Sequence, residues 1–169
     1  MSVHTKILIF SDSHGNTRNL SRAIGEHAGS VDLILHLGDG IADLPPETKA
    51  ISRVLRGNFE DCFHRYYEVP TEQLFTVAGK KILACHGHRH SIKTFEAMLA
   101  LYAVEKEADI VLFGHTHVPY LRYAPEEEYG RPLHLFNPGS IGSPRGGKAS
   151  YGILEISENG VLLSHRYMD

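Results

Sequence analysis

Cysteine is scarce in this sequence, and its scarcity excludes two kinds of site. Cys62 and Cys85 are the only cysteines among 169 residues, and they do not form a CxxC pair. A disulfide framework and a thiolate zinc site both need more sulfur at closer spacing. We therefore expect a reducing compartment.

Long apolar runs and an excess of basic charge are also missing. The segment from Met1 to Lys6 leads into only four apolar residues before Ser11, too few for a signal-peptide core or a membrane span. The formal net charge of -3 leaves no broad basic surface, so there is no strong nucleic-acid signature. We expect a cytoplasmic protein that does not bind membranes.

The composition is that of an ordinary globular protein, with 42% hydrophobic and 22% charged residues. A chain of 169 residues is near the commonest size of one domain, so a single domain over residues 1–169 is predicted.

Apolar runs and segments of helical spacing alternate along the first third of the chain, which is typical of parallel strands covered by helices. After Pro70 the pattern changes to hairpins. The predicted strands are 7–10, 33–37, 51–56, 73–77, 81–85, 110–113, 120–123, 133–136, 151–156 and 161–164, and the predicted helices are 17–27 and 92–107. This order favours a four-layer αββα sandwich of two mixed sheets with flanking helices.

Side chains that bind metals follow these apolar runs, where an α/β sheet places its ligands. Because side chains alternate in an extended segment, Asp12 and His14 point to one side, as do His115 and His117. Three further donors each end an apolar run: Asp39, Asn58 and His86.

Carboxylate, imidazole and amide donors without thiolate suit divalent manganese, iron, nickel or zinc rather than a structural zinc knot. Seven donors are too many for one tetrahedral ion. They suit two ions about 3.5–4 Å apart that share a carboxylate and a water. Asp39 is the best candidate for the bridging carboxylate.

The order of these motifs resembles that of the calcineurin-like metallophosphoesterases, in particular their small stand-alone prokaryotic phosphodiesterases. The matching residues are Asp12 and His14, Gly38-Asp39, Gly57-Asn58, His86-Gly87, Gly114-His115 with His117, and the segments 137–140 and 144–147. The resemblance implies that Asp12, His14, Asp39 and His117 hold one metal, and that Asp39, Asn58, His86 and His115 hold the other.

The resemblance also implies a function: hydrolysis of a small phosphodiester by a hydroxide that bridges two divalent ions, with manganese as the first choice. Asp39, Asn58, His86 and His88 are the expected catalytic residues, with His88 or a solvent molecule assisting the leaving group. Much of the superfamily has a histidine after Gly-Asn that protonates the leaving group, and Phe59 stands there in this sequence. Activated esters are therefore the expected substrates.

Two alternatives stay open at this stage. A homologous fold serves as a non-catalytic protein-binding scaffold in the retromer coat, although such a scaffold has no need for an intact ligand set. A phosphomonoesterase differs only in substrate, and Phe59 counts against it. Self-association into a homo-oligomer is also left open.

Several residues have plainer interpretations. The segment from Asp12 to His14 can cap the following helix, and Asn58 is a good turn former. His36 lies within an apolar run and is interpreted as a structural histidine. For His88, a solvated loop position is slightly preferred.

The glycine-rich segment 142–148 imitates a phosphate-binding loop, but Ala149 replaces the Ser or Thr that would hold magnesium, and a strand follows. We therefore reject that interpretation. Arg145 within it is as well suited to a bidentate contact with a substrate phosphate as to a solvated loop.

Overall fold

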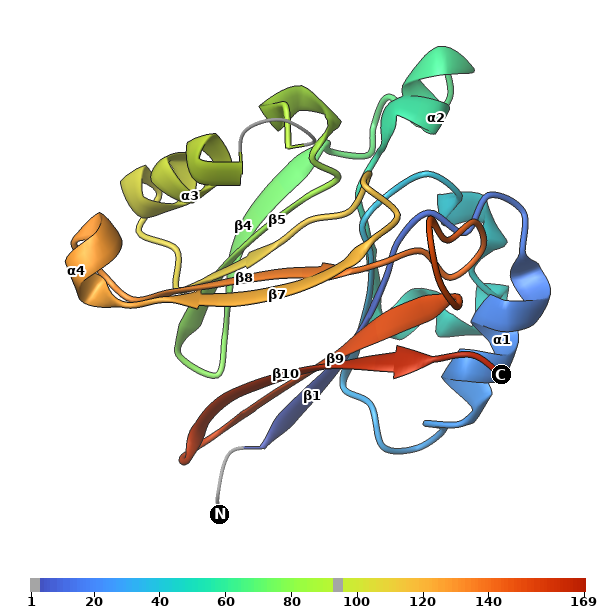
Figure 1. Cartoon of the computed structure of the whole chain (residues 1–169). Coiled ribbons are helices and arrows are strands. Elements are labelled where there is room, and N and C mark those ends of the chain that lie inside the picture. Colours follow the sequence, from blue (N-terminus) through green and yellow to red (C-terminus); the bar gives the residue numbers. More distant parts are fainter. Residues whose placement is uncertain (1–3, 93–95) are drawn as a thin grey trace.

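The computed structural model describes residues 4–92 and 96–169, and its strands form two five-stranded sheets (Figure 1). The first sheet has the order β10 (Gly160–Tyr167), β9 (Ser150–Ser157), β1 (Thr5–Phe10), β2 (Leu33–His36), β3 (Ser52–Val54). The second has the order β4 (Glu72–Val77), β5 (Lys80–Cys85), β6 (Ile110–Leu112), β8 (Leu133–Pro138), β7 (Pro119–Ala124). Both sheets are mixed. In the first, β1, β2 and β3 pair in parallel, and β9 pairs antiparallel with β1 and with β10. In the second, β5, β6 and β8 pair in parallel, and the edge strands β4 and β7 pair antiparallel with their neighbours.

The helices lie outside the sheets. They are α1 (Thr17–Gly25), α2 (Asn58–Cys62), α3 (Glu96–Glu105) and α4 (Glu126–Tyr129), with short 3-10 helices at Ile41–Asp43, Pro46–Ile51 and His88–His90. In Figure 1, α3 and α4 flank the second sheet and α1 lies beside the first. The four-layer αββα sandwich is thereby confirmed.

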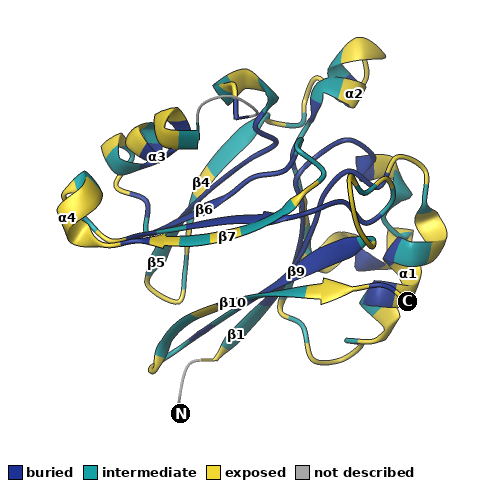
Figure 2. Ribbon diagram, viewed as in Figure 1, coloured by how far each residue is buried: buried dark blue, intermediate teal, exposed yellow. Residues whose placement is uncertain are grey.

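The side chains of β1 point alternately to its two faces, and this alternation explains how the layers are held together. Ile7 and Ile9 belong to the cluster between the sheets, where they meet residues such as Ile82 and Phe136. The next residue in each case, Leu8 or Phe10, belongs to the cluster that includes α1. A strand buried on both faces reads as a continuous apolar run, and Figure 2 shows β9, the neighbour of β1, largely in the buried colour.

The structure corrects several boundaries. The helix predicted over 17–27 ends at Gly25, and α3 runs from Glu96 to Glu105 within the predicted 92–107. Residues 93–95 of that prediction lie outside the described residues. Two short helices, α2 and α4, were not predicted, because five and four residues are too few to show helical periodicity.

The cap of α1 is also different from the one considered above. Asn16 accepts a hydrogen bond from the backbone N–H of Asn19 at 3.1 Å, so Asn16 caps this helix. The segment from Asp12 to His14 therefore does not cap this helix, and the preferred interpretation of these residues as metal ligands stays a prediction. Within the described part of the chain, no helix is long and apolar enough to cross a membrane.

Candidate metal centre

Loops that follow the central strands carry the predicted metal ligands to one place. Five of these residues have left-handed backbone conformations, with φ between 43° and 66°: Asp12, His14, Asp39, His115 and His117. Such angles cost energy in residues other than glycine, and they cluster where surrounding structure holds a functional geometry. At each of these five residues the left-handed backbone directs the side chain differently from the way a continued strand would.

Glycines in the motifs leave room for this arrangement. A Cβ on Gly57 would lie 2.2 Å from Oδ1 of Asp39, and a Cβ on Gly114 would lie 2.0 Å from Oγ of Ser11. Both distances are far inside van der Waals contact. The glycine before Asn58 and the one before His115 are therefore required by close packing behind the ligands.

Asp12 presents one carboxylate oxygen to the centre and uses the other for its own orientation. Its Oδ2 accepts hydrogen bonds from the hydroxyl of Ser11 at 2.5 Å and from the backbone N–H of His115 at 3.1 Å. Its Oδ1 is fully buried and accepts no hydrogen bond with good geometry among the described residues. Burial by itself would raise the pKa of Asp12, but His117, His14 and His86 hold it far below its usual range.

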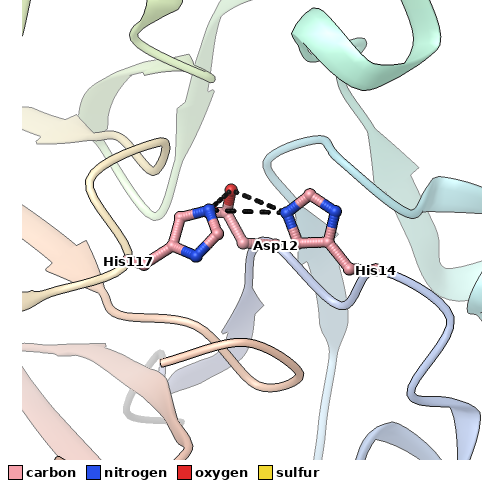
Figure 3. A group of neighbouring side chains, drawn as sticks. All are labelled: Asp12, His14 and His117. Atoms are coloured by element: carbon pink, nitrogen blue, oxygen red, sulfur yellow. Dashed lines mark hydrogen bonds and ion pairs between the residues drawn. The ribbon is translucent and has the colours of Figure 1, made fainter. Parts of the chain in front are cut away.

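The first group of donors is Asp12, His14 and His117, whose ligand atoms all lie within 4.8 Å of one another (Figure 3). Nε2 of His117 is 3.0 Å from Oδ1 of Asp12, and Nε2 of His14 is 3.7 Å from it. Nδ1 of His117 lies 2.6 Å from the carbonyl oxygen of Ser143, which can only accept. His117 therefore keeps a proton on Nδ1 and turns Nε2 toward the carboxylate.

The second group is Asp12, Asp39 and His86. Nδ1 of His86 donates to the carbonyl of Leu37 at 2.9 Å, so its Nε2 faces the centre. There it lies 3.5 Å from Oδ2 of Asp39 and 3.9 Å from Oδ1 of Asp12. Burial opposes protonation of His86, yet the two carboxylates raise its pKa above the ordinary value.

Asn58 and His115 lie at the edge of the second group. Oδ1 of Asn58, the first residue of α2, is 3.2 Å from Nε2 of His86. The ring of His115 lies against that of His86, with 5.2 Å between their centroids. All seven predicted ligands thus converge, and their role as ligands remains a prediction.

Both groups fit divalent cations. Imidazole nitrogens and carboxylate oxygens lie at separations of 3.0–3.9 Å, as if around an ion. A second hydrogen bond orients four of these side chains: Asp12, Asp39, His86 and His117. The Oδ1 of Asp12, which is buried and accepts no hydrogen bond among the described residues, needs a positive charge beside it. Without a cation, that charge comes from protonated histidine, and the pKa of His117 is accordingly raised by Asp12.

Two carboxylates, rather than one, span the groups. Asp12 belongs to both groups through Oδ1. Oδ2 of Asp39 is 3.8 Å from Nε2 of His14 and 3.5 Å from Nε2 of His86, while its Oδ1 accepts a hydrogen bond from the backbone N–H of Phe59. The predicted bridging role of Asp39 is compatible with this geometry, and Asp12 is a second candidate that the sequence did not reveal.

Glu60 is a positioning residue that the sequence analysis missed. It is 3% exposed, and its two oxygens accept hydrogen bonds from the backbone N–H groups of Asp39, Gly40, Ile41 and Gly57 at 2.7–3.2 Å. These bonds tie the loop that carries Asp39 to the start of α2. The only signal in the sequence is a glutamate three residues after Gly57, which is typical of a capping box.

Asn137 and Ser140 fix two other loops. The buried side-chain amide of Asn137 donates to the carbonyl of Gly114 at 2.9 Å and to the hydroxyl of Thr116 at 3.0 Å. The hydroxyl of Ser140 donates to the carbonyl of Asp12 at 2.7 Å. The segment 137–140, which the resemblance included, therefore supports the loops that carry Asp12 and His117 rather than contributing ligands.

Two further histidines, His36 and His88, lie close to the donor loops and have different surroundings. His36 is fully buried, its Nδ1 accepts from the backbone N–H of Gly38 and its Nε2 lies 3.0 Å from the hydroxyl of Ser13. Burial lowers the pKa of His36 to about 4, so it is a neutral structural histidine, as predicted. His88 is 14% exposed and lies 3.2 Å from Oδ2 of Asp61, with its ring 5.3 Å from that of His86. Interpreting His88 as a solvated loop residue was wrong.

The glycine-rich segment 142–148 is followed by strand β9, which confirms the rejection of a phosphate-binding loop. Arg145 is exposed at this point, and its backbone N–H donates to the carbonyl of His117 at 3.1 Å. The backbone of Arg145 thus lies beside His117 of the first donor group.

Comparison with known proteins agrees with this geometry. The family described as the calcineurin-like phosphoesterase superfamily domain matches residues 5–159. The probable metallophosphoesterase YsnB of Bacillus subtilis is 34% identical over 156 residues, which cover 90% of this chain and 85% of that protein. The phosphodiesterase YfcE of Escherichia coli K12 is 28% identical over 174 residues, covering 89% of this chain and 87% of that protein.

A solved structure agrees as well. The crystal structure of a predicted phosphoesterase from Streptococcus pneumoniae TIGR4 is similar with a TM-score of 0.73 and 27% identity, over 97% of this chain and 99% of that one. The chain therefore belongs to the calcineurin-like phosphoesterase superfamily and is a metal-dependent phosphoesterase.

Proposed function

We propose that this protein is a phosphodiesterase that uses two divalent metal ions, with manganese as the first choice. The observation that carries the proposal is the pair of overlapping donor groups, Asp12 with His14 and His117, and Asp12 with Asp39 and His86. Two ions held side by side would lower the pKa of a water between them and neutralise charge on the phosphoryl oxygens.

The residues of the chain would do three things. Asp12, Asp39, Asn58 and the four histidines His14, His86, His115 and His117 would hold the ions. The backbone contacts of Asp39 and the Nδ1 hydrogen bonds of His86 and His117 keep these donors in place before any ion binds. His88, anchored by Asp61, would assist the leaving group only while its imidazole is protonated, and burial lowers its pKa below the ordinary value.

Phosphodiesters rather than phosphomonoesters are favoured by two considerations. YfcE, a relative that covers most of this chain, is named a phosphodiesterase. Phe59 occupies the position where a general-acid histidine is expected from the resemblance, and its ring is set edge-on to His14 at 5.6 Å. A substrate whose leaving group departs without protonation suits that site.

The test is a metal-by-substrate screen. The metal-stripped protein is reloaded with manganese, nickel, iron or zinc, bound ions are counted by elemental analysis, and bis(p-nitrophenyl) phosphate is compared with p-nitrophenyl phosphate. We expect about two ions per chain and faster hydrolysis of the diester. One ion per chain at saturation contradicts the dinuclear proposal, and faster hydrolysis of the monoester contradicts the proposed substrate.

A matched pair of variants separates ligand loss from general damage. His14→Ala removes a donor of the first group, whereas His4→Ala removes a histidine whose side chain is 54% exposed beside Glu155. We expect only the first to lower metal content and activity. An intact donor set that binds no metal in wild type would favour the scaffold alternative.

Three further expectations remain predictions from the sequence: the cytoplasmic location, the single domain over residues 1–169 and any self-association.

A further inference from the structure

A cavity of about 350 Å³ adjoins the donor groups on the side of His14. Four of its lining residues have a planar group in their side chain: Phe59, Phe63, Arg65 and Tyr66. Its volume is at the lower end of the range for small-molecule sites, about 300–1,000 Å³, and so suits one part of a substrate rather than a large molecule.

We propose that this cavity takes a planar aromatic group of the substrate, either a nucleobase or a simple aryl ester group. The inference rests on the proposed function, because it places that group beside the phosphate that the metal centre would bind. His14 is the link, since it belongs to the first donor group and also lines the cavity.

The exposure of two phenylalanines supports the proposal. Phe59 is 42% exposed and Phe63 is 59% exposed, although apolar side chains of this size usually find cover. Their centroids are 4.8 Å apart with a 58° angle between the rings, so they form two walls of a corner rather than a closed stack. An aromatic group that enters the corner can pack on one ring face and meet the edge of the other.

The two carboxylates that line the cavity already accept hydrogen bonds from the protein. Both oxygens of Glu60 accept backbone hydrogen bonds, and Oδ2 of Asp43 accepts from the hydroxyl of Ser13 and the backbone N–H of Gly15. These carboxylates are therefore not directed at a ligand. The aromatic rings and the planar guanidinium of Arg65, which can stack on an aromatic face, are left for recognition.

Direct binding tests the cavity without relying on turnover. The manganese-loaded protein is titrated calorimetrically with phenylphosphonate and with methylphosphonate, which share one anionic group and differ in the aromatic ring. Stacking on an aromatic side chain raises affinity by about 5- to 150-fold. We expect phenylphosphonate to bind at least about fivefold more tightly, and the preference to be largely lost in Phe63→Ala.

Tyr123→Ala is the matched control, because Tyr123 is 55% exposed on β7 and does not line the cavity. Phe63 is mostly exposed, so its truncation leaves little internal void. Equal binding of the two phosphonates by wild type overturns the inference, as does a preference that Phe63→Ala leaves unchanged or that Tyr123→Ala also removes.

A second pair of ligands tests whether the aromatic group is a nucleobase or a simple aryl ester group. Adenosine 5′-monophosphate and ribose 5-phosphate differ by the base. Tighter binding of the former supports a nucleobase, while a preference seen only with phenylphosphonate supports an aryl ester. Hydrolysis of diesters without any aromatic preference overturns this inference alone. Aromatic preference in a protein that hydrolyses no diester overturns the proposed function instead.

Discussion

Glu60→Gln is the substitution that most directly tests how the centre is held. Glu60 is almost fully buried, and each of its oxygens accepts two backbone N–H groups: Oε1 from Gly40 and Ile41, and Oε2 from Asp39 and Gly57. Glutamine has nearly the same shape, but one oxygen becomes an NH2 group. Whichever way the amide turns, two backbone donors lose their acceptor and face another donor.

The cost follows from the hydrogen bonds lost. A hydrogen bond to a charged group contributes about 1.5–3 kcal/mol, so losing two lowers the free energy of unfolding by about 3–6 kcal/mol. Domains are typically stable by about 5–15 kcal/mol, which makes this a large fraction. Since two of the affected loops carry Asp39 and Asn58, metal affinity should fall as well.

Urea unfolding measures the first effect, and metal titration of the folded protein measures the second. Glu158→Gln is the control. This substitution makes the same chemical change at a residue that is exposed in the turn between β9 and β10. A Glu60→Gln protein within about 1 kcal/mol of wild type, with unchanged metal affinity, would refute the reasoning.

Four further predictions concern the centre and its surroundings. Asp39→Ala should abolish activity and release metal, because Oδ2 of Asp39 lies between histidines of both groups; full occupancy by elemental analysis with near-normal activity contradicts this. His115→Ala and His117→Ala should each weaken one metal site in a titration, and equal loss of both sites in both variants indicates a single cooperative cluster. Phe59→His should accelerate cleavage of diesters with poor leaving groups, by up to about 10²–10⁴-fold if the new imidazole is well placed; a wild-type rate independent of leaving-group pKa, with chemistry rate-limiting, indicates that another acid is already present. Because burial lowers the pKa of His36 to about 4, from an ordinary 6.5, the unfolded chain binds its proton first as pH falls. The free energy of unfolding should then drop by about 3 kcal/mol between pH 6.5 and 4, more than in His36→Asn, and an equal pH dependence in the two proteins contradicts the burial argument.

The sequence determined the layers of the fold because burial leaves a local pattern. A strand such as β1, covered on both faces, appears as an unbroken apolar run, and the buried residues Leu20 and Ala23 of α1 show helical spacing. The same logic located the donors, since residues such as Asp12 and Asp39 directly follow such runs. The short helix α2 was not predicted, because it has too few residues for the helical period of apolar side chains to be visible.

Only the tertiary structure decided how the donors meet. The left-handed backbone at Asp12, Asp39 and His117 aims their side chains, and no alternation of sequence letters records that turn. The sharing of Asp12 between two groups and the support of the Asp39 loop by Glu60 join residues that are 20 or more positions apart. Residue type and spacing therefore determined which atoms are available to bind metal. Long-range hydrogen bonds and packing decided which oxygen or nitrogen of each side chain faces the centre, because those contacts form only when the two sheets are in place.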